Sequence, residues 1–345
     1  MMKQKILELL HKPIFWIGCG ALLVVVLLIW ICPYFFMKSE KTEWVLIYPK
    51  ATEEKLDSAI YATFDHSFAS HTLTFLHLFK VNPANRTGAY KIEKGKSPFQ
   101  VAHQLKSAGQ TPIKFTFNNV RTIDELGNKV AKNFMMSKKD FFNALFNDST
   151  LSAWGYNKET VRSIFLPDSY EFYWTVKPEK MISTIKSYHD NWWTPARIKK
   201  AQKMNLSPED ATTIASITEE ETAKMDERGK VARLYINRLV KGMPLQADPT
   251  VKFALNDFTI RRITKEHLKV VSPYNTYSVK GLPPGPIRFP EKSSIDAVLN
   301  APMHSYIYMC AKEDFSGYHN FTDNFAQHLA FARNYQAALN KKGIN

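Results

Sequence analysis

The chain has 345 residues, three cysteines and a formal net charge of +14 at pH 7. This length predicts about two domains, and the three cysteines exclude both a disulfide framework and a cysteine-rich metal site. A composition of 45% hydrophobic residues, with 13 glycines and 18 prolines, excludes collagen-like and low-complexity chains. The positive charge alone fits nucleic acid, an anionic membrane face or a cell-wall polymer as a partner.

The first predicted element is a transmembrane helix over residues 13–37, which carry no charged side chain. About 20 apolar residues are enough to cross a bilayer, and Trp16 and Trp30 are typical of the two interfaces. A cleaved signal peptide is disfavoured because the apolar run is long and no small-residue cleavage site follows it. Three lysines and one glutamate precede the span, and two lysines and one glutamate follow it. This bias favours a cytoplasmic tail over residues 1–12, with the rest of the chain outside, and argues against a nucleic-acid partner.

The next segment, residues 43–136, is predicted to form a small α+β module. Strands are expected over 44–48, 89–93 and 113–117, and helices alternate with them. Capping boxes predict where these helices begin: Ser97 with Gln100, Thr122 with Glu125, and a capped start at Ser137 beyond the module. The module is interpreted as a holder of an extended polymer, with a folded spacer as the alternative. A change of composition after Met136 places a second domain over residues 150–345.

Two common catalytic signatures do not occur in the sequence. It contains no His-Glu-x-x-His pair of metal ligands and no Gly-x-Ser-x-Gly nucleophile elbow. A metal hydrolase and a serine hydrolase therefore have no support, and no metal or cofactor is expected.

The most informative segment is a predicted helix that begins with a capping box at Ser207-Pro-Glu-Asp210 and runs over residues 211–222. At about 100° per residue, Ile214, Ile217 and Glu221 share one apolar stripe. The adjacent Glu219 and Glu220 point away from that stripe, as a solvated face would.

A carboxyl group on the apolar side of a helix is a candidate general acid. Burial raises a carboxyl pKa, and a general acid that works near neutral pH needs a raised pKa. The alternative is that Glu221 is a helix-end residue paired with a cation such as Arg228. Helical phase alone leaves both interpretations open.

Two segments beyond this helix suggest saccharide recognition. An amphipathic helix is predicted over residues 226–241, followed by a turn that opens at Asp248-Pro249. Residues 272–286 then form a loop dense in Tyr, Asn, Thr, Gly and Pro. Such a loop presents hydroxyls, amides and aromatic faces on a stiff backbone, although a purely structural loop remains the alternative.

Five segments in this order resemble the endolytic murein transglycosylases, the YceG-like or MltG family. The resemblance is strongest over residues 205–330 and looser over 43–200. The segments are Ala215-Ser-Ile-Thr-Glu-Glu-Glu-Thr222, Val231-Ala-Arg-Leu-Tyr-Ile-Asn-Arg-Leu239, Gly242-Met-Pro-Leu-Gln-Ala-Asp-Pro-Thr-Val251, Tyr274-Asn-Thr-Tyr277 and Gly281-Leu-Pro-Pro-Gly285.

This resemblance implies a fold class and a set of site residues. The fold would be α+β, with an N-terminal transmembrane helix, a LysM-like α+β module and a mixed α+β catalytic domain. The family's catalytic glutamate directly precedes Thr in a Glu-x-Glu-Thr motif, which corresponds to Glu221 here. Asp248 is either a binding residue or a structural turn opener, and the roles of His319, Asn324 and His328 stay open. The residues implied to hold sugars and orient the acid are Gln246, Asp248, Tyr274, Asn275 and Tyr277.

The implied substrate is the glycan strand of peptidoglycan, at a bacterial plasma membrane with the catalytic domain on the outer side. The implied reaction is cleavage between N-acetylmuramic acid and N-acetylglucosamine with a 1,6-anhydromuramyl product, which would end strand elongation. Cell-wall synthases are candidate partners, and residues 13–37 would contact the lipid bilayer.

Two other functions remain open at this stage. One is a water-using glycoside hydrolase in which Glu219 or Asp248 is the second carboxylate. The other is an anchored scaffold that binds glycan without cutting it.

Overall fold

The computed structural model describes residues 13–118 and 120–343, so the predicted cytoplasmic tail over residues 1–12 lies outside the described residues. The chain is mixed α and β, as predicted, and forms two compact units. One unit comprises Met1–Ile113 and Glu171–Thr175, and the other comprises Lys114–Tyr170 and Val176–Asn345. The domain boundary predicted between residues 136 and 150 lies inside the second unit.

Helix α2 (Pro13–Phe36) is the one helix in the described part of the chain that is long and apolar enough to cross a membrane, over Trp16–Phe36. Its apolar side chains are exposed from Ile17 to Ile29. Its last turn packs on the first unit, where the Phe35 ring lies 5.4 Å from the Phe99 ring, centroid to centroid. The end of the apolar helix therefore packs on the rest of the first unit.

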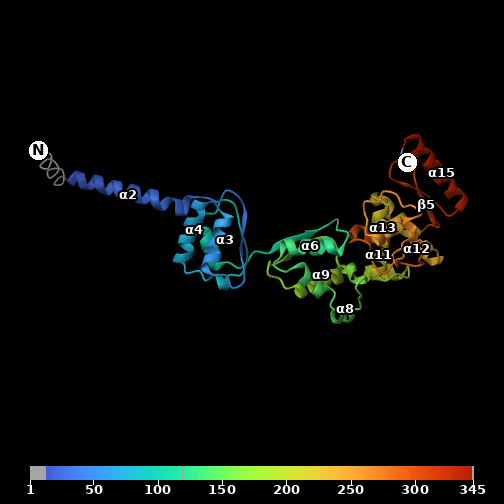
Figure 1. Cartoon of the computed structure of the whole chain (residues 1–345), viewed down its shortest axis with the longest axis horizontal. Helices are drawn as coiled ribbons and strands as arrows, with labels where there is room; N and C mark the ends of the chain where they lie inside the picture. The colour runs from blue at the N-terminus through green and yellow to red at the C-terminus, as the bar shows by residue number, and fades with distance from the viewer. Residues whose placement is uncertain (1–12, 119, 344–345) are drawn as a thin grey trace. The chain divides into compact units, whose positions relative to one another are not determined.

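The first unit is a strand–helix–helix–strand arrangement followed by one more helix. Strands β1 and β2 pair antiparallel, with Glu43 opposite Ile92 and Ile47 opposite Gly88. Helices α3 and α4 lie side by side in this unit (Figure 1), and α4 was not predicted. Its elements are β1 (Glu43–Ile47), α3 (Glu53–Thr63), α4 (His66–Leu78), η1 (Pro83–Asn85), β2 (Gly88–Ile92) and α5 (Pro98–Ser107).

Short polar side chains begin the helices where the sequence predicts. Ser97, Ser137 and Ser207 each close a complete capping box. Thr122 also caps its helix by accepting from the Glu125 N–H. The predicted box at Thr122 is incomplete, however, because the Glu125 carboxylate accepts from the N–H of Arg121 rather than from that of Thr122.

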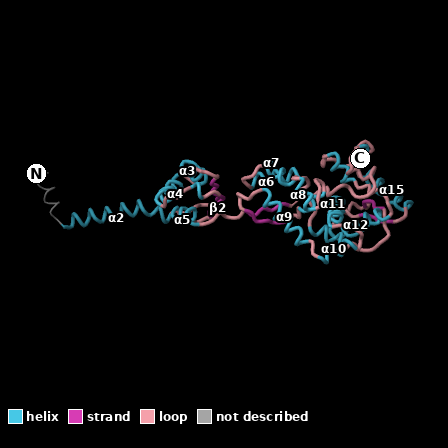
Figure 2. Tube along the Cα trace, turned by 90° about the horizontal axis from the view of Figure 1, so that it is seen from below, coloured by secondary structure: helices cyan, strands magenta, loops and turns pink. Residues whose placement is uncertain are grey.

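The second unit is mostly helical, with short strand pairs among the helices (Figure 2). Strands β3 (Ile113–Phe117) and β4 (Asp168–Phe172) form one two-stranded sheet, through which the division between the units passes. Strands β5 (Tyr308–Ala311) and β6 (His319–Thr322) form an antiparallel pair with Tyr308 opposite Thr322. The helices are α6 (Ile123–Asn133), α7 (Lys138–Leu145), α8 (Asp148–Trp154), η2 (Thr160–Ile164), α9 (Pro178–Trp192), α10 (Pro195–Gln202), α11 (Pro208–Glu221), α12 (Met225–Val240), α13 (Asp248–Leu255), η3 (His267–Lys269), α14 (Lys292–Leu299) and α15 (Phe325–Lys341).

Helix α11 is the central helix of the second unit, and every residue from Ala211 to Glu219 is buried. It packs against both α12 and α14. A helix covered in this way has no solvated face, so the expectation that Glu219 lies on such a face is wrong. The Glu219 side chain is instead paired with Arg228 and Arg288.

Candidate active site

Glu221 is the last residue of α11, and its side chain is half-buried. The hydroxyl of Tyr235, on the neighbouring helix α12, donates to Glu221 Oε1 at 2.7 Å. The Tyr235 side chain is itself buried. Glu221 is therefore held by a neutral hydroxyl group, and no ion pair to it occurs within the described residues.

Burial raises the pKa of Glu221 from 4.5 to about 7. The hydrogen bond from Tyr235 opposes this change, and the nearby charge of Asp248 adds to it. Lys252 on α13 lowers the pKa by a smaller amount. The C-terminal end of a helix also disfavours negative charge, so the position of Glu221 on α11 acts in the same direction as burial. At neutral pH the carboxyl is thus divided between its acid and base forms.

A second carboxyl and a second tyrosine lie in the same region. Asp248 is the first residue of α13, and its Oδ1 accepts from the Tyr277 hydroxyl at 2.5 Å. Tyr277 lies in the loop of residues 272–286, and burial raises the pKa of its phenol. In the Asp248–Tyr277 pair and in the Glu221–Tyr235 pair, a tyrosine hydroxyl therefore donates to a carboxyl oxygen.

The segment before α13 carries a strained residue. Gln246 has φ 53°, a left-handed conformation that non-glycine residues adopt infrequently. Its side-chain oxygen accepts from Nη2 of Arg238, and its N–H donates to the Thr276 carbonyl at 3.0 Å. The Thr276 hydroxyl also accepts from the Ala247 N–H. These bonds fasten the two predicted binding segments to each other, so the side chains that they carry are held in place before any ligand binds.

Glu221, Gln246, Asp248 and Tyr277 line one cavity of about 410 Å³. A cavity of this size fits the 300–1,000 Å³ range of small-ligand sites. Its other lining residues come from α12, from the segment before α13, from strands β5 and β6 and from α15: Leu234, Tyr235, Arg238, Leu245, Tyr308, Met309, Cys310, Ala311, His319, Phe325 and His328.

The structure does not bring Tyr274 and Asn275 to this cavity. Tyr274 is buried in the core of the second unit, with its ring 4.7 Å from that of Phe253. The Asn275 amide donates to the carbonyls of Leu268 and Val270 and so holds the loop that precedes it. Tyr274 and Asn275 therefore make contacts within the fold, whereas Tyr277, in the same loop, lines the cavity.

The three C-terminal residues with open roles separate in the same way. Asn324 caps α15 by accepting from the Gln327 N–H. His319 and His328 both line the cavity. His319 is fixed by Glu227, which accepts its main-chain N–H at 2.8 Å and lies 2.8 Å from its Nδ1 atom.

Sequence reasoning missed several lining residues. Tyr235 lies in the amphipathic helix predicted over residues 226–241, but a helical pattern does not reveal which group a hydroxyl bonds to. Arg238 and Tyr308 had no assigned role. Arg238 lies in a segment that resembles the family, and Tyr308 lies in a C-terminal region rich in aromatic residues. These were the signals that could have identified them.

The two glutamates beside Glu221 are fixed in a network of ions. Glu219 accepts from the Ser294 hydroxyl and from the Glu291 N–H, in addition to its two arginine partners. Glu220 pairs with Arg121 at 3.0 Å and with Arg288 at 2.7 Å. Neither carboxylate lines the cavity. Of the three consecutive glutamates, only Glu221 combines access to a cavity with a raised pKa.

Comparisons with known proteins agree with this arrangement. The sequence model of the YceG-like family matches residues 53–334. The endolytic murein transglycosylase of Bacillus subtilis (strain 168) is 36% identical over 162 residues, which cover 47% of this chain and 43% of that protein. The endolytic murein transglycosylase of Streptococcus pneumoniae (strain D39) is 28% identical over 149 residues, which cover 42% of this chain and 27% of that protein. The chain thus spans less than half the length of these curated relatives.

A solved structure extends the likeness beyond these segments. The crystal structure of a yceG-like protein from Listeria monocytogenes superposes with a TM-score of 0.57 at 22% identity. The superposition covers 84% of this chain and 98% of that chain. At this level of identity the likeness shows a shared fold.

Proposed function

Because the chain belongs to the YceG-like family, we propose that it is a membrane-anchored lytic transglycosylase, a lyase that cuts peptidoglycan glycan strands internally. The single observation that carries this proposal is Glu221, a cavity carboxyl whose pKa is raised to about 7. The bond cleaved would be the one between N-acetylmuramic acid and N-acetylglucosamine, and cleavage of new strands would end their elongation.

In the proposed reaction Glu221 acts first as an acid and then as a base. The protonated carboxyl gives its proton to the glycosidic oxygen as the bond to C1 of the muramyl residue breaks. The carboxylate then takes the proton of the C6 hydroxyl of the same sugar, and the C6 oxygen bonds to C1. Glu221 ends protonated, no water is consumed, and the product is a 1,6-anhydromuramyl end. One carboxyl suffices because the nucleophile belongs to the substrate, which raises its effective concentration.

Gln246, Asp248 and Tyr277 are proposed to hold the sugar next to Glu221. Asp248 also has an electrostatic role, because its negative charge raises the pKa of Glu221 and so favours the acid form. A negative charge beside C1 would in addition stabilise the positive charge that develops on the sugar in the transition state.

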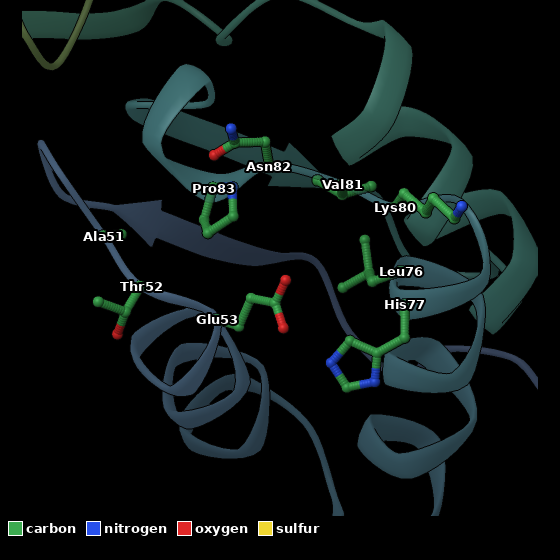
Figure 3. Close-up of a pocket in the computed structure, with 9 residues that line it drawn as sticks. All are labelled: Ala51, Thr52, Glu53, Leu76, His77, Lys80, Val81, Asn82 and Pro83. Atoms are coloured by element: carbon green, nitrogen blue, oxygen red, sulfur yellow. The ribbon is translucent and has the colours of Figure 1, made fainter.

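The first unit is proposed to be a LysM-like module that holds the polymer. Its strand–helix–helix–strand order and antiparallel β1–β2 pair support this proposal. So does a pocket of about 580 Å³ between the start of α3 and the end of α4. Glu53 and His77 extend toward each other across this pocket, below Pro83 (Figure 3). Polar groups around a hollow of this kind suit a sugar chain.

Helix α2 is proposed to anchor the protein in the plasma membrane, with the N-terminus in the cytoplasm and both units outside. The support is the length and apolar character of Trp16–Phe36. The partners proposed on this basis are the glycan strands, the lipid bilayer and the cell-wall synthases that make those strands.

The decisive experiment is digestion of purified glycan strands by the full chain in detergent, followed by mass spectrometry of the new ends. Ends that are one water lighter than reducing ends support the transglycosylase. Reducing ends would instead support a hydrolase, which the presence of Asp248 in the same cavity makes the second candidate. Binding without new ends would support the anchored scaffold.

A further inference from the structure

Three aromatic rings gather on the C-terminal side of the Glu221 cavity. Tyr308 lies on β5, and Phe325 and His328 lie on the first turn of α15; all three line the cavity. The Tyr308 and His328 rings are stacked, with centroids 5.2 Å apart and an interplanar angle of 21°. The Phe325 ring lies 5.5 Å from that of Tyr308. Helix α15 and β5 are neighbours in the second unit (Figure 1), so this cluster is part of one folded body.

These rings are not fully packed against the rest of the protein. The Phe325 side chain is 56% exposed, although it is one of the largest apolar side chains. His328 Nδ1 is buried and has no hydrogen-bond partner among the residues that the structure describes. An exposed aromatic ring beside an unpartnered polar atom indicates a place where a ligand completes the contacts.

The same cavity also has a polar surface. Gln246, Asp248 and Tyr277 line the same cavity with an amide, a carboxylate and a hydroxyl. Arg238 connects the two surfaces, since it donates to Gln246 Oε1 and, through Nη1, to the Ile307 carbonyl at 3.2 Å. Ile307 directly precedes Tyr308, so one buried arginine fixes both the polar and the aromatic surface.

A pyranose ring matches this combination. Its hydroxyl groups lie around the edge and accept or donate hydrogen bonds, whereas its axial C–H groups form an apolar face. The face of an aromatic ring carries partial negative charge and attracts such polarised C–H groups. Burial, together with the charge of Arg238, lowers the pKa of His328, so its ring is neutral at pH 7 and can take part in stacking.

We propose that Tyr308, Phe325 and His328 form a stacking subsite for one sugar ring of the glycan strand next to Glu221. This proposal rests on the proposed function, because it assumes a saccharide in the cavity. It assigns to the C-terminal hairpin and α15 the task of holding the strand while Glu221 acts on it.

The test is made on Phe325, because an exposed ring can be removed without loss of the fold. The full chain carrying Glu221→Gln, which binds without cutting, is titrated calorimetrically with peptide-free oligosaccharides of alternating N-acetylglucosamine and N-acetylmuramic acid. Adding Phe325→Ala should weaken binding about tenfold. Phe325→Tyr should restore most of the affinity, whereas Phe325→Leu should not, because leucine has no ring face. In the chain with Glu221 intact, Phe325→Ala should raise KM and leave the pH profile of kcat/KM unchanged.

The matched control is Leu329→Ala, which removes a 43% exposed apolar side chain from the same helix, one turn farther on and outside the cavity lining. This variant should bind as tightly as the unaltered chain. Unchanged binding by Phe325→Ala, an equal loss for Leu329→Ala, or full affinity of Phe325→Leu would each overturn the subsite. If the intact chain releases no new ends but binding depends on Phe325, the proposed reaction fails and the subsite stands.

Discussion

Replacement of Glu221 by glutamine tests the centre of the proposed mechanism. Glutamine keeps the shape of the side chain and can still accept the hydrogen bond from the Tyr235 hydroxyl. It cannot give a proton to the glycosidic oxygen or take one back. General acid–base catalysis typically contributes 10²–10⁴-fold to a rate, so the number of anhydro ends formed per unit time should fall by at least about that factor. Glu220→Gln on the same helix is the matched control, and it should keep most of its activity because Glu220 does not line the cavity.

The same substitution should change stability in a way that depends on pH. A carboxyl whose pKa rises from 4.5 to about 7 on folding binds its proton more tightly in the folded state. Its ionisation therefore costs stability as pH rises from about 4.5, and the full cost of about 3 kcal/mol is reached above pH 7. Glutamine removes this cost. Glu221→Gln should equal the unaltered chain in stability below pH 4.5 and exceed it by up to about 3 kcal/mol at pH 8, an increase of several degrees in Tm.

Both measurements use one preparation of each variant. End formation is counted on a single batch of glycan strands, and thermal unfolding is followed at pH 4, 6 and 8. The reasoning would be refuted if Glu221→Gln kept near-normal turnover while Glu220→Gln or Glu219→Gln lost it. A stability gain that did not depend on pH would show that the carboxyl is not desolvated in the folded state.

Three further predictions concern Tyr235, Glu219 and the orientation of α2 in the membrane. Tyr235→Phe removes a hydrogen bond that lowers the Glu221 pKa, so the alkaline limb of kcat/KM should move up by about one pH unit; Tyr170→Phe, which loses a buried hydroxyl bonded to a main-chain carbonyl, should leave the profile in place. Glu219→Gln leaves a buried arginine without its counter-ion, so urea unfolding should show a loss of about 3 kcal/mol while activity per folded molecule is kept. A reporter that folds only outside the cytoplasm, fused to the C-terminal end of the chain, should be active; a silent reporter with an active cytoplasmic counterpart would reverse the proposed orientation.

The sequence predicted those parts of the fold that depend on short-range chemistry. A serine followed three residues later by an acid or amide marks a helix start whatever the rest of the chain does, and Ser97, Ser137 and Ser207 all cap as predicted. Strands β1, β2 and β3 lie within one residue of their predicted positions. Helix α4 and the β5–β6 pair were missed. The buried residues of α4, such as Phe68, Thr72 and Leu76, do recur at helical spacing, so the sequence contained a signal for this helix.

Helical phase was informative about Glu221 but misleading about its neighbour. The argument from phase assumes one buried side and one solvated side, and α11 is covered by α12, by α14 and by the loop before α14. Glu219 is buried for that reason. In the loop of residues 272–286, Tyr277 lines the cavity but Asn275 does not. Composition identifies residues suited to sugars, but the same hydrogen-bonding groups also stabilise turns, as the Asn275 amide does.

What distinguishes the three consecutive glutamates is the set of groups around each carboxyl, together with the burial of Glu221 at the end of α11. Glu219 and Glu220 each form ion pairs with arginine side chains. Glu221 has a neutral phenol as its hydrogen-bond donor and a second carboxylate, that of Asp248, nearby. Adjacent residues of one type thus acquire different roles, since two are tied into ion pairs of the framework and one lines the cavity with its pKa raised to about 7. Two of these arginines, Arg121 and Arg288, come from distant parts of the chain, whereas Arg228 lies on the next helix, so the fold decides which of the three glutamates is left without an ion pair.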